Sequence, residues 1–229
     1  MKERESAVKK FIRRMKSDYA FRTIIYAALS FFATAVFTFY NLYLGIAYRA
    51  EWNFCIAAYY AVLVAMRASV IWYERKTNLS DEAEDIKGRK KRSAFLMQSV
   101  LLFIIDFALI TPVSLMVMQK KAISYSTIPA IVIAAYTTYK ISISARNYFK
   151  AKKQKNLSVR MLRDISLIDA AVSLLSLQYT LIMTFGDGVQ GEMLTLCAAT
   201  SLIIWVMLLA FSARTVVFAV KCKKTNLTD

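Results

Sequence analysis

The sequence predicts an all-α, polytopic membrane protein with six transmembrane helices, and three observations support this fold class. Hydrophobic residues make up 58% of the chain and charged residues 20%, whereas a typical soluble domain has about 45–50% apolar residues. The apolar residues gather in six long runs. The Lys and Arg residues gather on alternate connections between those runs. Together these features favour a chain that crosses a membrane six times.

Six apolar runs supply the elements in chain order. Each run reaches the length of about 20 residues that a helix needs to cross about 30 Å of hydrocarbon. The first run follows a basic leader and has no small-residue cleavage site after a short core, so we expect it to stay in the mature protein. The runs cover residues 23–47, 53–73, 93–118, 126–145, 165–185 and 192–220.

The distribution of Lys and Arg predicts the orientation of the spans. Residues 1–22, 74–92, 145–163 and 221–229 hold 25 of these cations, and the other connections hold only Arg49, Lys120 and Lys121. Loops rich in Lys and Arg stay in the cytoplasm. We therefore expect a multi-pass protein of the cell membrane with both termini cytoplasmic.

The net charge of +16 indicates contact with anionic lipids of the inner leaflet, at about 1 kcal/mol for each cation near the surface. The cations lie at the ends of membrane spans instead of on a soluble basic domain with interleaved aromatic residues. We therefore expect the lipid bilayer as a partner and no nucleic acid.

The chain is expected to divide into a leader and one membrane domain. Residues 1–16 form a basic amphipathic leader that we place on the inner membrane surface or, alternatively, against a partner protein. Residues 17–229 form a single six-helix domain. Its acidic and then basic segment "DEAEDIKGRKKR" is expected to extend the third transmembrane helix into the cytoplasm.

Three similar stretches predict an internal repeat within that domain. They read "KTNLSD", "QKNLSV" and "KTNLTD", and each follows an arginine near the end of an even-numbered span. The spacing favours three tandem parallel helical hairpins, each beginning at a serine that can cap a helix. Chance similarity between basic loop ends is the alternative. The predicted hairpins are 17–79, 80–157 and 158–227, and the capping serines are Ser17, Ser80 and Ser158.

Ionisable residues inside the apolar runs are the main candidates for function. Arg67, Lys140, Asp169 and Arg214 share one layer in the inner half of the bilayer, and Asp106 lies deeper. An unpaired charge there costs at least about 2.5–3.5 kcal/mol. We expect Asp169 and Asp106 to offset two of the three cations around a polar cavity open to the cytoplasm, which leaves one positive charge. Alternatively, Arg67 and Arg214 extend to the lipid headgroups, and the other polar groups only join helices.

Polar residues also recur at helical spacing along five of the six runs, which predicts stripes that face a shared interior. The stripes are Thr23, Ser30, Thr34 and Asn41; Asn53, Tyr60, Arg67 and Glu74; Gln98 and Asp106; Tyr136, Lys140 and Ser144; and Asp169, Ser173, Ser176 and Thr180. The candidate cavity or substrate-binding residues are Arg67, Asp106, Lys140, Asp169, Arg214, Tyr60, Tyr136, Gln98 and Ser173.

These candidates favour a small transporter or channel with a net-cationic cavity for a small anionic or phosphate-bearing solute, because Lys and Arg are the usual phosphate ligands. With five glycines and two prolines, the chain is poor in the residues that break transporter helices. The alternative is therefore a non-transporting sensor, scaffold or subunit that binds another membrane protein or a second copy of itself.

An enzyme is not expected, because the chain has no histidine and no G-x-S-x-G, H-E-x-x-H or P-loop motif. Its three cysteines are scattered without a C-x-x-C pair. We therefore expect no metal and no cofactor.

Three segments resemble a group of small, uncharacterised six-span membrane proteins of Gram-positive bacteria. They read "EWNFCIAAYYAVLVAMR", "AAYTTYK" and "SLIDAAVSLLSLQYTLIMTFG". The resemblance covers most of the chain and implies a bacterial cytoplasmic membrane. It brings no substrate and no catalytic residue.

Overall fold

The computed structural model describes residues 19–79, 83–118, 127–151, 157–185 and 190–224, and within these ranges it is built of helices without a strand. The predicted all-α class is confirmed. The helices are α2 (Tyr19–Tyr48), α3 (Glu51–Leu79), α4 (Glu84–Ala108), α5 (Ile110–Met118), α6 (Thr127–Ala151), α7 (Leu157–Phe185) and α8 (Gln190–Lys224). The predicted leader, Ser17 and Ser80 lie outside the described residues.

Six helical stretches of the described chain are long and apolar enough to cross a membrane, as the sequence predicts. The third stretch joins α4 and α5 and covers Glu84–Leu115. These stretches make the chain a multi-pass membrane protein. Large apolar side chains exposed along the bundle, such as Phe32, Phe39 and Met97, are suited to contact with lipid because they need no hydrogen-bond partner.

The two prolines explain where the third span is interrupted and where the fourth span begins. Pro112 has no N–H, and its ring crowds the carbonyl four residues earlier, at Ala108, where α4 ends. Pro129 is the third residue of α6, a position whose N–H has no partner inside a helix. The predicted helical extension of the third span is confirmed from Glu84 onward, because α4 begins there and runs into the span without a break; its cytoplasmic placement stays a prediction.

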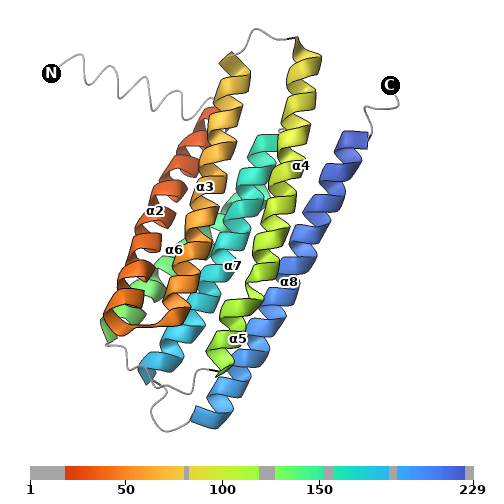
Figure 1. The fold of residues 1–229 in the computed structure, drawn as a ribbon. Coiled ribbons are helices and arrows are strands. Elements are labelled where there is room, and N and C mark those ends of the chain that lie inside the picture. The colour runs from red at the N-terminus through yellow and green to blue at the C-terminus, as the bar shows by residue number, and fades with distance from the viewer. Residues whose placement is uncertain (1–18, 80–82, 119–126, 152–156, 186–189, 225–229) are drawn as a thin grey trace, which may run out of the picture.

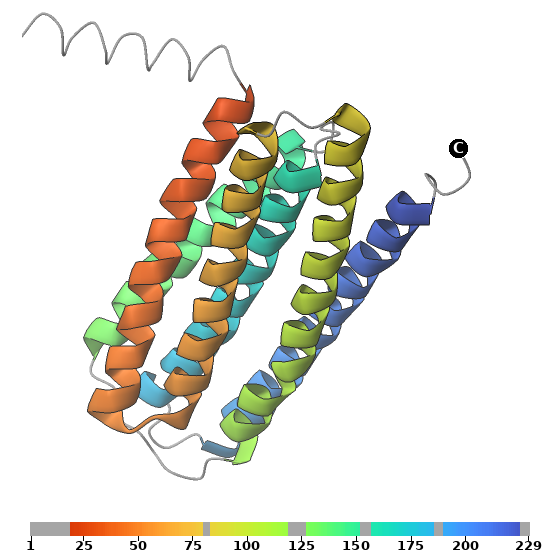
Figure 2. The same ribbon diagram turned by 45° about the horizontal axis from the view of Figure 1, so that its top comes forward.

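Successive spans run in opposite directions (Figure 1). The starts of α2, α4 and α7 and the ends of α3, α6 and α8 lie at one end of the bundle, and the starts of α3, α6 and α8 and the ends of α2, α5 and α7 lie at the opposite end (Figures 1 and 2). Helix α7 packs against α2, α3, α4, α6 and α8. It is the most buried span, at 56%, whereas α8 is the least buried, at 17%. The core therefore forms around α7.

Close packing follows the first predicted hairpin but not the other two. Helix α2 packs on α3, whereas α6 packs chiefly on α7 and α4 chiefly on α8. Two polar contacts favour these pairs: Lys140 of α6 bonds to Asp169 of α7, and Trp205 of α8 donates to the backbone carbonyl of Asp106 in α4. The threefold repeat stays a prediction. Ser158 lies inside α7, and its hydroxyl donates to Glu74.

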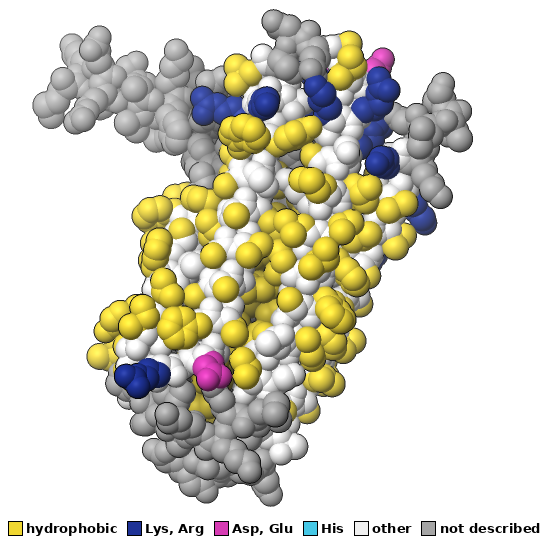
Figure 3. Space-filling model, in the orientation of Figure 1, with side chains coloured by type: hydrophobic (Ala, Val, Ile, Leu, Met, Phe, Trp, Pro, Cys, Tyr) yellow, Lys and Arg dark blue, Asp and Glu magenta, His cyan; other side chains and the backbone are white. Residues whose placement is uncertain are grey.

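The two ends of the bundle differ in their charged side chains. Lys and Arg side chains gather at the end that holds the start of α2 and the end of α8, and apolar side chains cover the middle (Figure 3). We call this end the basic end. Its described cations come from α3, α4, α6, α7 and α8, whereas Arg49 lies in the α2–α3 connection at the opposite end. The described part of the chain therefore carries the charge asymmetry that the sequence indicates.

Candidate functional site

The polar stripes of five helices turn inward, as the sequence predicts. Lipid offers no hydrogen-bond partners, so polar side chains within a membrane face the interior of a helical bundle. Tyr136, Glu74 and Ser30 are half-buried, and the side chain of Thr23 lies outside the described part of the chain. The fully buried members are Thr34, Asn41, Asn53, Tyr60, Arg67, Gln98, Asp106, Lys140, Ser144, Asp169, Ser173, Ser176 and Thr180.

One carboxylate, that of Asp169 on α7, joins side chains from three other helices. Its Oδ2 atom accepts hydrogen bonds from Arg67 Nη2 of α3 at 2.6 Å, from Lys140 Nζ of α6, and from Thr34 Oγ1 of α2 at 3.0 Å. We call these four residues the ion cluster. Arg67 is 1% exposed, Lys140 3% and Asp169 0%. The cluster is therefore closed to solvent in this conformation.

Thr34 is the member of the ion cluster that was absent from the predicted site. Its hydroxyl oxygen accepts hydrogen bonds from Arg67 Nη1 at 2.6 Å and from Lys140 Nζ. Its proton lies within reach of the Ser30 carbonyl at 2.8 Å and of Asp169. The inward stripe on the first span was the only signal for Thr34, because a hydroxyl carries no charge to mark it.

The ion cluster has a formal charge of +1, since Arg67 and Lys140 share the single carboxylate of Asp169. The prediction that one positive charge is left is therefore met, but by a different pairing. Asp106 forms no ion pair within the described residues and accepts a hydrogen bond from Tyr59 instead. Arg214 is exposed and joins no ion pair there either. The predicted roles of Asp106 and Arg214 in balancing the cations are wrong.

Asp106 and Arg214 miss the ion cluster because their side chains lie on other faces of the bundle. Asp106 lies where α4 meets α3 and α8, and it contacts Tyr59 and Trp205. Arg214 lies on α8, the least buried span, so its guanidinium extends away from the core. Depth along a helix places a charge in the bilayer, but only packing decides which charges meet.

Two predicted tyrosines and Ser173 adjoin the ion cluster. The ring of Tyr136 stacks on Phe37 with centroids 3.8 Å apart, and Lys140 Nζ lies 5.2 Å from the Tyr136 centroid, within the range of a cation–π contact. The ring of Tyr60 meets Phe37 edge-on. Its hydroxyl lies beside Ser173 and Ser176 of α7.

Several buried polar atoms around the cluster lack a hydrogen bond of ordinary geometry. Three of them are donors, namely Arg67 Nε and the hydroxyl groups of Tyr60 and Tyr136. One acceptor, Asp169 Oδ1, is in the same position. Buried polar groups are nearly always hydrogen-bonded, whether to protein, to water or to an ion, so each of these atoms is available to a partner of one of those kinds.

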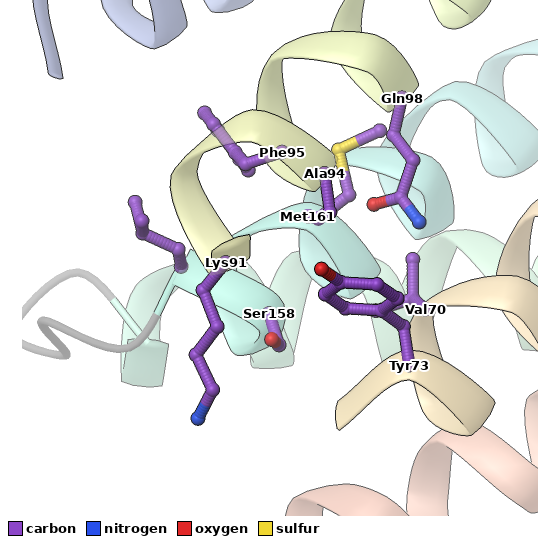
Figure 4. A pocket seen from close by; sticks show the side chains of 9 residues that line it. Val70, Tyr73, Lys91, Ala94, Phe95, Gln98, Ser158 and Met161 are labelled. Atoms are coloured by element: carbon purple, nitrogen blue, oxygen red, sulfur yellow. The ribbon is translucent and has the colours of Figure 1, made fainter. Parts of the chain in front are cut away.

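Gln98 belongs to a different place in the bundle. Its side chain donates to Ser69 Oγ at 3.2 Å and lines a pocket between α3, α4 and α7 near the basic end, with Tyr73, Lys91 and Ser158 around it (Figure 4). Glu74 of α3 links α4 and α7 through two pocket residues, since it accepts hydrogen bonds from Lys91 at 3.1 Å and from Ser158. Gln98 is therefore not part of the ion cluster.

Comparison with models of known protein families, with curated proteins and with solved structures finds no match to this chain. Among the described residues, no three His, Cys, Asp or Glu side chains are grouped so that they could hold a metal ion. The chemistry of the ion cluster is therefore the basis for assigning a function.

Replacing Asp169 should destabilise the protein more than replacing either of its cations. Asp169→Asn leaves two buried cations without a counter-charge, and breaking a buried ion pair in this way costs about 3–5 kcal/mol. Lys140→Met leaves the Arg67–Asp169 pair neutral and should cost much less. The double variant should recover part of the loss of Asp169→Asn, because a single cation is then left.

Thermal unfolding in detergent, followed by circular dichroism, measures this order. Lys87→Met at the basic end is the control and should unfold at the wild-type temperature. A Lys140→Met variant as unstable as Asp169→Asn would contradict the shared-carboxylate arrangement.

Proposed function

We propose that this protein is a small membrane transporter or channel for a small anion, and that the ion cluster binds the anion. The observation that carries the proposal is the formal charge of +1 on a cluster that is buried between four helices. A cation at this depth needs a counter-charge or water. A small anion that enters the cluster supplies the missing negative charge.

The unpartnered donors support the same chemistry. Arg67 Nε and the hydroxyl groups of Tyr60 and Tyr136 can each donate a hydrogen bond, and an anion offers acceptor atoms to all three. Guanidinium and ammonium groups make strong, charge-assisted hydrogen bonds to phosphate and carboxylate oxygens. Inorganic phosphate and other small oxyanions fit this donor set, and chloride fits its charge.

Transport through a closed cluster requires the helices around it to move. The candidate spans other than α4–α5 are continuous helices, so the movement is one of whole helices against each other, such as the rocking that opens other transporters. We assign the basic end to the cytoplasm of a bacterial cell, where its Lys and Arg side chains meet anionic lipids.

The alternative function is a non-transporting membrane protein in which the ion cluster only joins helices. The exposed apolar face of α8, with Leu202, Ile203, Val206 and Met207, favours this alternative because a second membrane protein or another copy of the chain can pack there. Anion binding separates the two functions, since a cluster that is only structural binds no solute.

Anion flux tests the proposal directly. Purified protein in liposomes should carry radiolabelled phosphate or chloride faster than protein-free liposomes do. Lys140→Met should lower this flux at least about tenfold, because a hydrogen bond to a charged group contributes about 1.5–3 kcal/mol. Lys87→Met, which keeps the cluster intact, should match wild type. Wild-type flux at the level of empty liposomes for both anions would overturn the proposal and favour the alternative.

Cysteine labelling tests the orientation. In a chain whose three native cysteines are replaced by alanine, Arg49→Cys should react with a membrane-impermeant maleimide in intact cells. Lys87→Cys should react only after the membrane is permeabilised, because it lies at the opposite end of the bundle. The reverse labelling pattern would contradict a cytoplasmic basic end.

A further inference from the structure

Asp106 is a second buried acid, and it lies outside the ion cluster. Its side chain is 0% exposed, within a membrane span. Tyr59 donates a hydrogen bond to its Oδ1 atom at 2.8 Å, and its Oδ2 atom is buried without a hydrogen-bond partner in the described residues. One oxygen of this carboxyl group therefore has a hydrogen-bond partner, and the other has none among the described residues.

Within the described ranges, the surroundings of Asp106 offer no counter-charge. The groups that act on its carboxyl are the hydroxyls of Tyr59 on α3 and Ser212 on α8. No charged side chain from the described parts of α3, α5, α7 or α8 forms an ion pair with it. Two other buried acids differ in this respect. Asp169 is paired with Arg67 and Lys140, and Asp164 lies 3.0 Å from Arg163 Nη2.

We propose that Asp106 is a proton-binding site that is occupied at neutral pH. A carboxylate buried without a cation costs far more than the neutral acid, so a bound proton is the means of removing its charge. The hydrogen bonds locate the proton. Oδ1 accepts from Tyr59 and is the carbonyl oxygen, which leaves Oδ2 to carry the hydrogen.

Ser212 of α8 lies beside the carboxyl group and can accept that hydrogen after a small side-chain movement, since no hydrogen bond of ordinary geometry joins it to Oδ2. Its own hydroxyl proton points to the backbone carbonyl of Leu208, at 3.0 Å, so the lone pairs of its oxygen are available to Asp106. The third span is interrupted just beyond Asp106, where α4 ends at Ala108 and α5 begins at Ile110. Trp205 Nε1 donates a hydrogen bond to the backbone carbonyl of Asp106 at 3.0 Å. Buried acids inside a membrane bundle mark proton pathways in pumps and transporters.

Infrared spectroscopy of the protein at neutral pH, in a detergent that has no carbonyl group, tests this site. A protonated carboxyl has a carbonyl stretching band that an ionised one lacks, and wild type should show it. Asp106→Asn should remove the band. Asp164→Asn is the matched control and should retain it, because Asp164 is paired with arginine. A wild-type spectrum without the band, or a band that survives in Asp106→Asn, would overturn the proposal.

Tyr59→Phe tests the same site without removing the acid, and it decides the matter if Asp106→Asn does not fold. The band should persist and move to higher frequency, because the carbonyl oxygen loses its hydrogen bond from Tyr59. A band at the wild-type frequency in Tyr59→Phe would assign the protonated carboxyl to another residue and refute the proton site at Asp106.

Discussion

The carboxylate of Asp169 is the constraint on which the rest of the bundle depends. Side chains from α2, α3 and α6 bond to one oxygen of a residue on α7. Each of these groups would be costly in hydrocarbon by itself, so the four helices are stable together only in a register that brings them into contact. This accounts for the central place of α7 and for the close packing of α6 upon it.

Two buried acids are neutralised in different ways because different helices face them. The carboxylate of Asp169 meets cations from α3 and α6, whereas the carboxyl group of Asp106 meets hydroxyl groups from α3 and α8. Tyr59 and Tyr60 connect the two places. Consecutive residues of a helix point about 100° apart, so Tyr59 reaches Asp106 on α4 while Tyr60 faces Phe37 and α7. The surroundings of the two buried acids are therefore linked through this one pair of adjacent tyrosines.

The sequence was sufficient for features that depend on local periodicity and insufficient for those that depend on which faces meet. The six spans, the inward stripes and the depth of Arg67, Lys140 and Asp169 follow from hydropathy and helical spacing. The role of Thr34 and the uncharged surroundings of Asp106 do not, because both depend on the spatial order of helices far apart in the chain. Arg214 was misplaced for the same reason, since its depth matched Arg67 but its helix lies at the edge of the bundle.

Under the proposed transport function, the closed ion cluster limits how an anion can pass. Asp169 already binds both cations, so an entering anion must compete with its carboxylate for Arg67 and Lys140 instead of entering an open charged pore. Separation of the cluster without an anion would leave three buried charges unpaired, at a cost of several kcal/mol. An anion offsets that cost by taking one of the two cations while Asp169 keeps the other. Movement of the helices is then favoured only when the solute is bound, which is the property that distinguishes a carrier from a leak.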